Sequence, residues 1–100
     1  MHYLLCYDLA PDYLETRGKY RNEHLRLAWE AQQRGELIMG GAFSDPADMS
    51  VLFFQGESPA VIEAFVKADP YMIHGVVTGY KIRQWNTVVG TDAFTPLRPE

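Results

Sequence analysis

His24 and Asp69 are the two residues of this 100-residue sequence whose types best suit proton chemistry. Imidazole changes charge near neutral pH and serves as a general acid or base, and an aspartate within its reach would fix its tautomer. Both residues also have plain structural explanations. A core-facing histidine needs only one hydrogen bond, and an aspartate before a proline, as in Asp69-Pro70, is a good helix cap. Spacing along the chain does not decide between the chemical and the structural explanation.

Other reactive side chains give weaker signals. Gly40-Gly41 lacks the further glycines of a dinucleotide fingerprint and the lysine of a phosphate-binding loop. Ser44 lacks the glycine-flanked turn that presents a nucleophilic serine. His2 and His74 show no spacing to each other or to Cys6 that suggests a metal site. We therefore expect no metal and no nucleotide cofactor.

The composition predicts one globular domain, because 47% of the residues are hydrophobic and 22% are charged. The formal net charge is −4 and no basic stretch occurs, so we expect neither a nucleic-acid nor a membrane partner. Cys6 is the only cysteine and gives no reason to expect an oxidising compartment. The first residues lead straight into an apolar strand, without the basic region of a signal peptide. We expect a cytoplasmic protein.

Four short segments have the residue types and the flanking turn signals of β-strands. They are His2 to Asp8, Glu36 to Phe43, Ser50 to Gln55 and Val76 to Asn86. Residues 91–100 hold two prolines and no periodicity. We therefore expect a folded domain over residues 1–90 and a C-terminal tail over residues 91–100.

Two helices are predicted between these strands. The first runs from Tyr13 to Arg34, and its inward face is expected to carry Tyr20, His24, Leu27 and Ala31. The second begins with Ser58 as its cap and Pro59 at its first position, and Asp69-Pro70 ends it and caps a further short turn. The residues expected to form its buried stripe are Val61, Ala64, Phe65 and Ala68.

The order β-α-β-β-α-β predicts a ferredoxin-like α+β fold, a four-stranded antiparallel sheet with both helices on one face. The strands are apolar on both faces: Tyr3, Leu5 and Tyr7 alternate with Leu4 and Cys6. A sheet with one solvated face would alternate apolar and polar residues instead. A second cover is therefore needed. A homodimer or higher homo-oligomer is the leading interpretation, and a half-open ligand cleft is the alternative.

The same topology gathers the candidate chemistry at one edge of the sheet. Three segments meet there: the start of the first helix, the turn after the second strand and the end of the second helix. The candidate residues on these segments are Arg21, His24, Gly41, Ser44, Asp69 and Tyr71. A histidine, a carboxylate and a glycine-containing turn that converge without being close in sequence are typical of an active site.

The strings Arg21–Leu25, Leu37–Gly41 and Ala68–Tyr71, the last followed by Gly75-Val76, resemble the YCII-related proteins over about Met1 to Trp85. The resemblance implies the ferredoxin-like fold and sheet-to-sheet dimerisation as a dimeric α+β barrel. It also implies that a His–Asp pair, here His24 and Asp69, forms the active site. The motif positions that surround this pair, and that the resemblance makes substrate-binding, are Arg21, Gly41, Ser44 and Tyr71.

The broader superfamily includes isomerases, dehalogenating enzymes and monooxygenases that act on small, often aromatic or lactone-like molecules. The sequence and the resemblance together favour a cofactor-independent lyase or isomerase, in which His24 moves a proton and Asp69 orients it. A non-catalytic binder of small molecules, or an accessory domain, is the competing hypothesis. A purely structural dimerisation module is the third.

Overall fold

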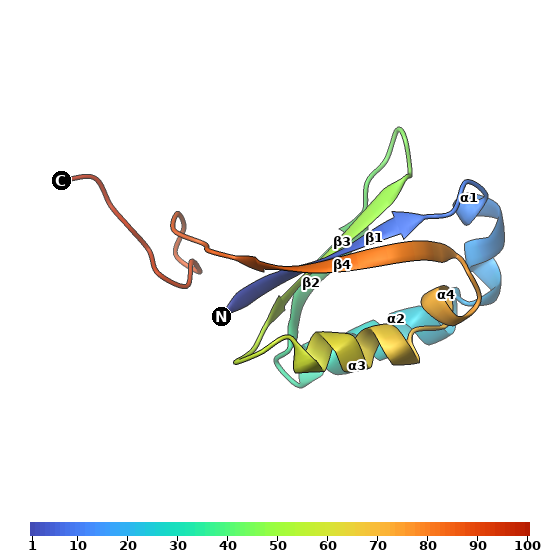
Figure 1. Cartoon of the computed structure of the whole chain (residues 1–100), viewed down its shortest axis with the longest axis horizontal. Helices are drawn as coiled ribbons and strands as arrows, with labels where there is room; N and C mark the ends of the chain where they lie inside the picture. The colour runs from blue at the N-terminus through green and yellow to red at the C-terminus, as the bar shows by residue number, and fades with distance from the viewer.

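The computed structural model describes all residues, 1–100, as a four-stranded antiparallel sheet with its helices on one face (Figure 1). The strands are β1 (His2–Leu9), β2 (Leu37–Ala42), β3 (Met49–Gln55) and β4 (Val77–Trp85), in the order β2-β3-β1-β4. The helices are α1 (Tyr13–Thr16), the 3₁₀ turn η1 (Arg17–Lys19), α2 (Arg21–Gln33), α3 (Ala60–Ala68) and α4 (Pro70–Ile73). The predicted ferredoxin-like α+β fold is confirmed.

The core lies between the sheet and the helices. Tyr3 pairs with Phe54 and Leu5 with Leu52 across β1 and β3, and all four side chains are buried. Their neighbours along the strands point to the opposite face, because side chains alternate along a β-strand. One face of the sheet therefore packs against the helices, and no helix covers the other face.

The prediction of one helix from Tyr13 to Arg34 is wrong in one respect. The segment consists of three helices, α1, η1 and α2, instead of one continuous helix. The break lies at Tyr20, whose backbone (φ −117°, ψ 0°) departs from helical values and whose N–H bonds to Arg17 three residues back. Gly18 weakens the helix just before this point. At this break the Tyr20 ring stacks on His74, with 4.3 Å between ring centroids.

The predicted buried stripe of the second helix is also partly wrong. Phe65 is buried as expected, but Ala64 and Ala68 are exposed and Val61 is only half-buried. Ile62 and Val66 are buried instead. Burying two large aliphatic side chains removes more apolar area from water than burying two alanines, so α3 is rotated to favour them.

The cap of α3 also differs slightly from the expectation. Pro59 directly precedes the helix instead of occupying its first position. The Ser58 hydroxyl still accepts a hydrogen bond from the Ala60 N–H, at 3.3 Å.

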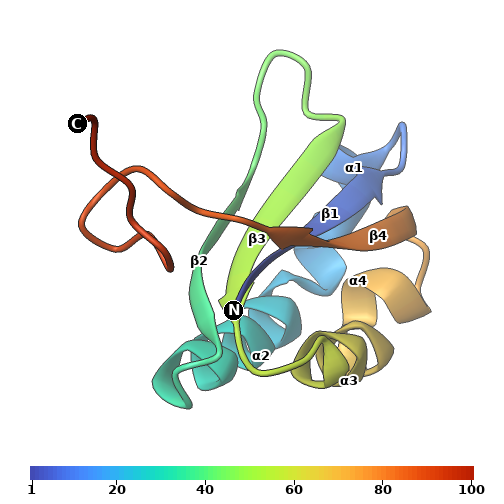
Figure 2. The same ribbon diagram turned by 60° about the vertical axis from the view of Figure 1, so that its left-hand side comes forward.

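Beyond β4 the chain has no regular helix or strand, and it bends back on itself before its C-terminus (Figure 2). The Thr87 hydroxyl accepts the Phe94 N–H at 2.7 Å and lies 2.7 Å from Nδ1 of the buried His2. The Thr95 N–H bonds to the Thr87 carbonyl. Residues 87–97 are thus tied to the start of β1. No helix of the protein is both long and apolar enough to cross a lipid bilayer.

Candidate active site

Asp69 lies at the junction of α3 and α4, and local sequence explains its backbone. It takes an extended conformation (φ −73°, ψ 118°) that ends α3, and Pro70 opens α4. Its side chain accepts the Tyr71 N–H at 3.0 Å, as the cap of α4. This is the capping role that the Asp-Pro pair predicts. The Asp69 side chain is fully buried.

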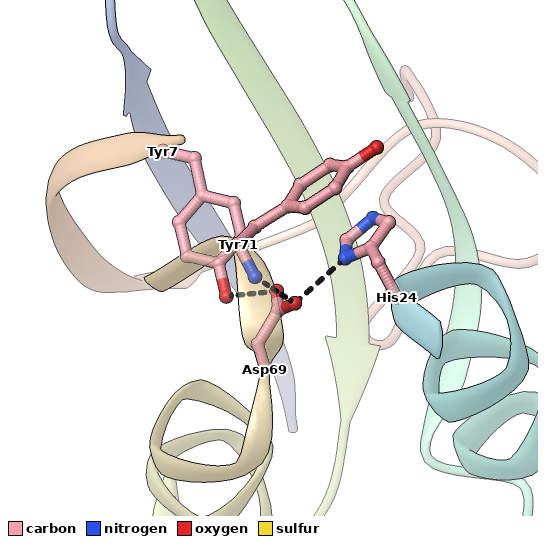
Figure 3. A network of polar contacts seen from close by, with 4 residues as sticks. All are labelled: Tyr7, His24, Asp69 and Tyr71. Carbon is pink, nitrogen blue, oxygen red and sulfur yellow. Dashed lines mark hydrogen bonds and ion pairs between the residues drawn. The ribbon is translucent and has the colours of Figure 1, made fainter. Parts of the chain in front are cut away.

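Two further donors converge on the same carboxylate (Figure 3). The Tyr7 hydroxyl, from β1, donates to Oδ2 at 2.7 Å, and Nδ1 of His24, from α2, lies 2.9 Å from Oδ1. A buried carboxylate is tolerated only when hydrogen bonds replace its lost hydration. Asp69 has such bonds from three different elements, and no buried side-chain polar atom of the protein lacks a partner.

The bond to Asp69 fixes how the His24 ring lies. The ring also stacks on Tyr71, with centroids 3.8 Å apart and planes 5° from parallel. The His24 side chain keeps 14% of its surface exposed, and Nε2 makes no hydrogen bond to the protein. With Nδ1 bonded to Asp69, Nε2 is the ring nitrogen that remains without a partner in the protein. One ring nitrogen is anchored and the other is available for chemistry.

Tyr7 is a member of this network that the sequence reasoning missed. Burial raises the pKa of the Tyr7 hydroxyl well above its usual value, and the negative charge of Asp69 and the hydrogen bond to it act in the same direction. The alternation of β1 already placed Tyr7 on the helix-facing side of the sheet. A buried tyrosine hydroxyl needs a partner, which was the available signal.

Removal of the Tyr7 hydroxyl should change the stability at alkaline pH. Because the pKa of Tyr7 is raised above 10.0 by folding, its contribution is complete below that pH and is lost as the pH rises further. Above that pH the wild-type free energy of unfolding should fall about 1.4 kcal/mol per pH unit more steeply than that of Tyr7→Phe. Urea unfolding at a series of alkaline pH values measures both slopes, and parallel slopes would contradict this prediction.

His24 lines a cleft of about 600 Å³ between α2 and β2. The predicted residues Arg21, Gly41 and Tyr71 line it as well, whereas Asp69 lies beneath its wall. A side chain at Gly41 would have no protein atom within 4 Å of its Cβ, so the glycine leaves the cleft wall open at this point. The fold thus brings five of the six predicted site residues to one place.

Ser44 does not line this cleft, and its role in substrate binding stays a prediction. It lines a second, smaller hollow that adjoins the cleft, because Tyr13, Arg17 and Ala42 line both. β2 ends at Ala42, and the connection to β3, which carries Ser44, then extends beyond the ends of the strands (Figure 2).

The cleft also contains residues that the sequence reasoning passed over. Arg17, Tyr13 and Trp29 line it, and the Arg17 guanidinium lies over the Tyr13 ring at 5.2 Å from its centroid. The i, i+4 spacing of Arg17 and Arg21 was a usable signal. This spacing is a weaker signal than in a continuous helix, because Arg17 belongs to η1 and Arg21 to α2.

The YCII-related domain family matches residues 1–86. The chain belongs to this family. The resemblance noted in the sequence is confirmed, and the match ends one residue after β4. No curated protein sequence matches the chain significantly.

Solved structures with the fold of this YCII-related protein include a dehydrochlorinase and a NIPSNAP family protein. The 5-chloro-2-hydroxyhydroquinone dehydrochlorinase TftG of Burkholderia phenoliruptrix AC1100, in complex with 2,5-dihydroxybenzoquinone, is 20% identical with a TM-score of 0.73. The alignment covers 87% of this chain and 95% of TftG. A NIPSNAP family protein of Agrobacterium tumefaciens str. C58 is 16% identical with a TM-score of 0.54, and the alignment covers 97% of each chain. At sequence identities of 20% and 16%, the similarity to these two structures establishes the fold alone.

The chemistry open to this YCII-related protein follows from its donor and acceptor groups. No group of three or more His, Cys, Asp or Glu side chains is arranged to hold a metal ion. The site offers an anchored imidazole with one free nitrogen, next to a cleft large enough for a small molecule. This arrangement suits proton transfer to or from a bound molecule.

Proposed function

We propose that this YCII-related protein is an acid/base enzyme of the lyase or isomerase type that works without a bound cofactor on a small cyclic or aromatic molecule. The observation that carries the proposal is the orientation of His24, with Nδ1 bonded to the buried Asp69 and Nε2 free beside the cleft. A structural role accounts for the bond at Nδ1, whereas the position of the ring beside an open cavity favours the chemical role.

In the proposed mechanism, Nε2 of His24 takes a proton from a carbon of the substrate. The electron pair of the broken C–H bond then forms a new double bond in the substrate. In an isomerisation an adjacent double bond of the substrate breaks, and its electron pair takes the proton back from Nε2 at another carbon. In a lyase reaction a leaving group departs with its bonding electrons. Asp69 stabilises the imidazolium that forms in between, because its oxygen already accepts the Nδ1–H bond.

The size of the cleft and the chemistry of a structural relative support a ring-shaped substrate. A cavity of about 600 Å³ lies within the usual range for small-molecule sites. TftG carries a dehydrochlorinase name and was solved with a benzoquinone. A chlorinated hydroxyhydroquinone is therefore the first compound to test on this protein.

The test is a turnover assay with a panel of hydroxylated and chlorinated ring compounds, run in D₂O and followed by NMR. The wild-type protein should exchange a carbon-bound hydrogen for deuterium or release chloride, and His24→Gln should not. If compounds bind to the wild-type protein but none is turned over or exchanged, the chain is a binding protein and the enzymatic proposal is wrong.

We also propose that two copies associate through the open face of the sheet. Apolar side chains lie only half-buried at its centre: Leu4, Cys6, Val51 and Phe53. No helix of this chain covers this face (Figure 1), where the rings of His2 and Trp85 pack against Phe53. A sheet with two apolar faces needs two covers. A second copy offers a surface of the same shape and chemistry, as a two-fold symmetric contact requires.

A charge placed on this face should separate the copies. Val51→Lys would put an unpaired ammonium group into the contact, and we expect its sedimentation velocity to correspond to one chain, whereas the wild-type protein sediments as two. The matched control is Leu14→Lys, because Leu14 lies on α1 with 62% of its surface exposed. A wild-type protein that sediments as a single chain at high concentration would refute the association.

A further inference from the structure

The charged groups that line the cleft are all positive or able to become so. They are the side chains of Arg17, Arg21 and His24, and no aspartate or glutamate is among the lining residues. The protein as a whole carries a formal net charge of −4. Asp69, the nearest acid to His24, is buried with both oxygens already bonded. A cationic cleft in an acidic protein indicates an anionic ligand.

Neither arginine forms an ion pair within the protein, although the Arg17 guanidinium lies over the Tyr13 ring. The ion pairs of this structure join His24 to Asp69, Arg26 to Glu23, and Arg34 to Glu36. Arg17 and Arg21 are in none of them. An arginine that lines a cavity without a carboxylate partner has its donors free for a ligand, and a guanidinium binds a carboxylate with two parallel hydrogen bonds.

The positions along α2 give the cleft a direction. Arg21, His24, Leu25 and Trp29 recur at helical spacing on one face, and all four line the cleft. With a rise of 1.5 Å per residue, His24 lies about 4.5 Å along the axis from Arg21, and Trp29 about 12 Å from it. The charged end, the proton-transfer group and an aromatic side chain therefore follow one another along the helix.

The far end of the cleft is apolar although it is open to solvent. Leu25, Trp29 and Met39 line it with 40%, 63% and 66% of their surfaces exposed. Large apolar side chains exposed together at the mouth of a cavity mark a binding surface more often than chance exposure. The ligand thus needs a flat or apolar part to cover them.

We infer that the ligand of this cleft is a small carboxylate joined to an aromatic or other flat apolar group, with its charge held by Arg17 and Arg21. The carboxylate lies at the η1 end, the carbon next to it lies beside Nε2 of His24, and the apolar group lies toward Trp29 and Met39. The inference rests on the proposed function only in taking the same cleft as the site, and the binding of the anion does not require turnover.

Phenylacetate and its neutral isostere phenylacetamide are the probes, titrated into ¹⁵N-labelled protein and followed by NMR. Phenylacetate should shift amide signals of α2 and β2 and should bind about tenfold more tightly than phenylacetamide, or better, because hydrogen bonds to a charged group are the stronger ones. Arg21→Gln and Arg17→Gln should each reduce that preference by about tenfold or abolish it, without changing the affinity for the amide.

Arg83→Gln is the matched control, since it removes one positive charge from exposed β4, outside the cleft. It should leave the preference intact, and the NMR spectrum of each variant reports whether the fold is retained. Any of three results would overturn the inference. They are equal affinities for the two probes, no amide shifts at millimolar phenylacetate, and a loss of the preference for phenylacetate that is as large in Arg83→Gln as in Arg21→Gln.

The His24→Gln variant separates this inference from the proposed function. It should keep the preference for phenylacetate even though it loses turnover. If turnover depends on His24 but neither arginine affects the preference, the anion inference fails and the enzymatic proposal stands. The reverse pattern leaves an anion-binding protein without acid/base catalysis.

Discussion

His24→Gln should lower kcat/KM by about a hundred- to ten-thousandfold, the contribution that general acid/base catalysis usually makes. Glutamine can still donate a hydrogen bond toward Asp69, so the contact that joins α2 to the α3–α4 junction can survive the change. It has no titratable nitrogen to accept a proton from the substrate. Steady-state kinetics on a substrate of the wild-type protein measures the loss, which should lie in kcat more than in KM.

His74→Gln is the control for this substitution. His74 is exposed, stacks on Tyr20 and is not among the residues that line the cleft. Its replacement should leave kcat/KM within about twofold of the wild-type value, as for most surface changes away from a site. Unchanged kcat/KM in a folded His24→Gln protein would end the acid/base proposal. An equal loss in both variants would point to a structural effect.

Asp69→Ala should cost about 3–5 kcal/mol of unfolding free energy, as the removal of one member of a buried pair generally does. The change leaves three donors without an acceptor: Nδ1 of His24, the Tyr7 hydroxyl and the Tyr71 N–H. A loss of this size is a large share of the roughly 5–15 kcal/mol that stabilises a typical domain. Urea unfolding monitored by circular dichroism measures it.

Two variants make the Asp69 result specific. Asp8→Ala removes an exposed aspartate from the end of β1 and should change the unfolding free energy by less than about 0.5 kcal/mol. Asp69→Asn keeps one acceptor oxygen, so its unfolding free energy should lie between those of Asp69→Ala and the wild-type protein. If Asp69→Ala lowers the unfolding free energy by no more than Asp8→Ala does, the hydrogen-bond network of Asp69 contributes little to the stability of the fold.

Much of the fold could be predicted because its signals are local. Asp69-Pro70 ends one helix and caps the next through hydrogen bonds that span two residues. Tyr20, His24, Leu27 and Ala31 do face inward, because helical spacing alone puts them on one side. The errors arose where non-local packing overrode the local pattern. Tyr20 breaks the helix where its ring meets His74, and α3 is rotated to bury Ile62 and Val66.

The sequence by itself determined the order of the elements, the inward face that carries His24 and the cap formed by Asp69. Only the tertiary structure decided that these two side chains meet at 2.9 Å, that Tyr7 joins them from β1, that Arg17 enters the cleft and that Ser44 stays outside it. The reason is physical. A hydrogen bond within a turn depends on a few neighbouring dihedral angles, whereas a contact between residues 45 or 62 positions apart depends on how every intervening element packs.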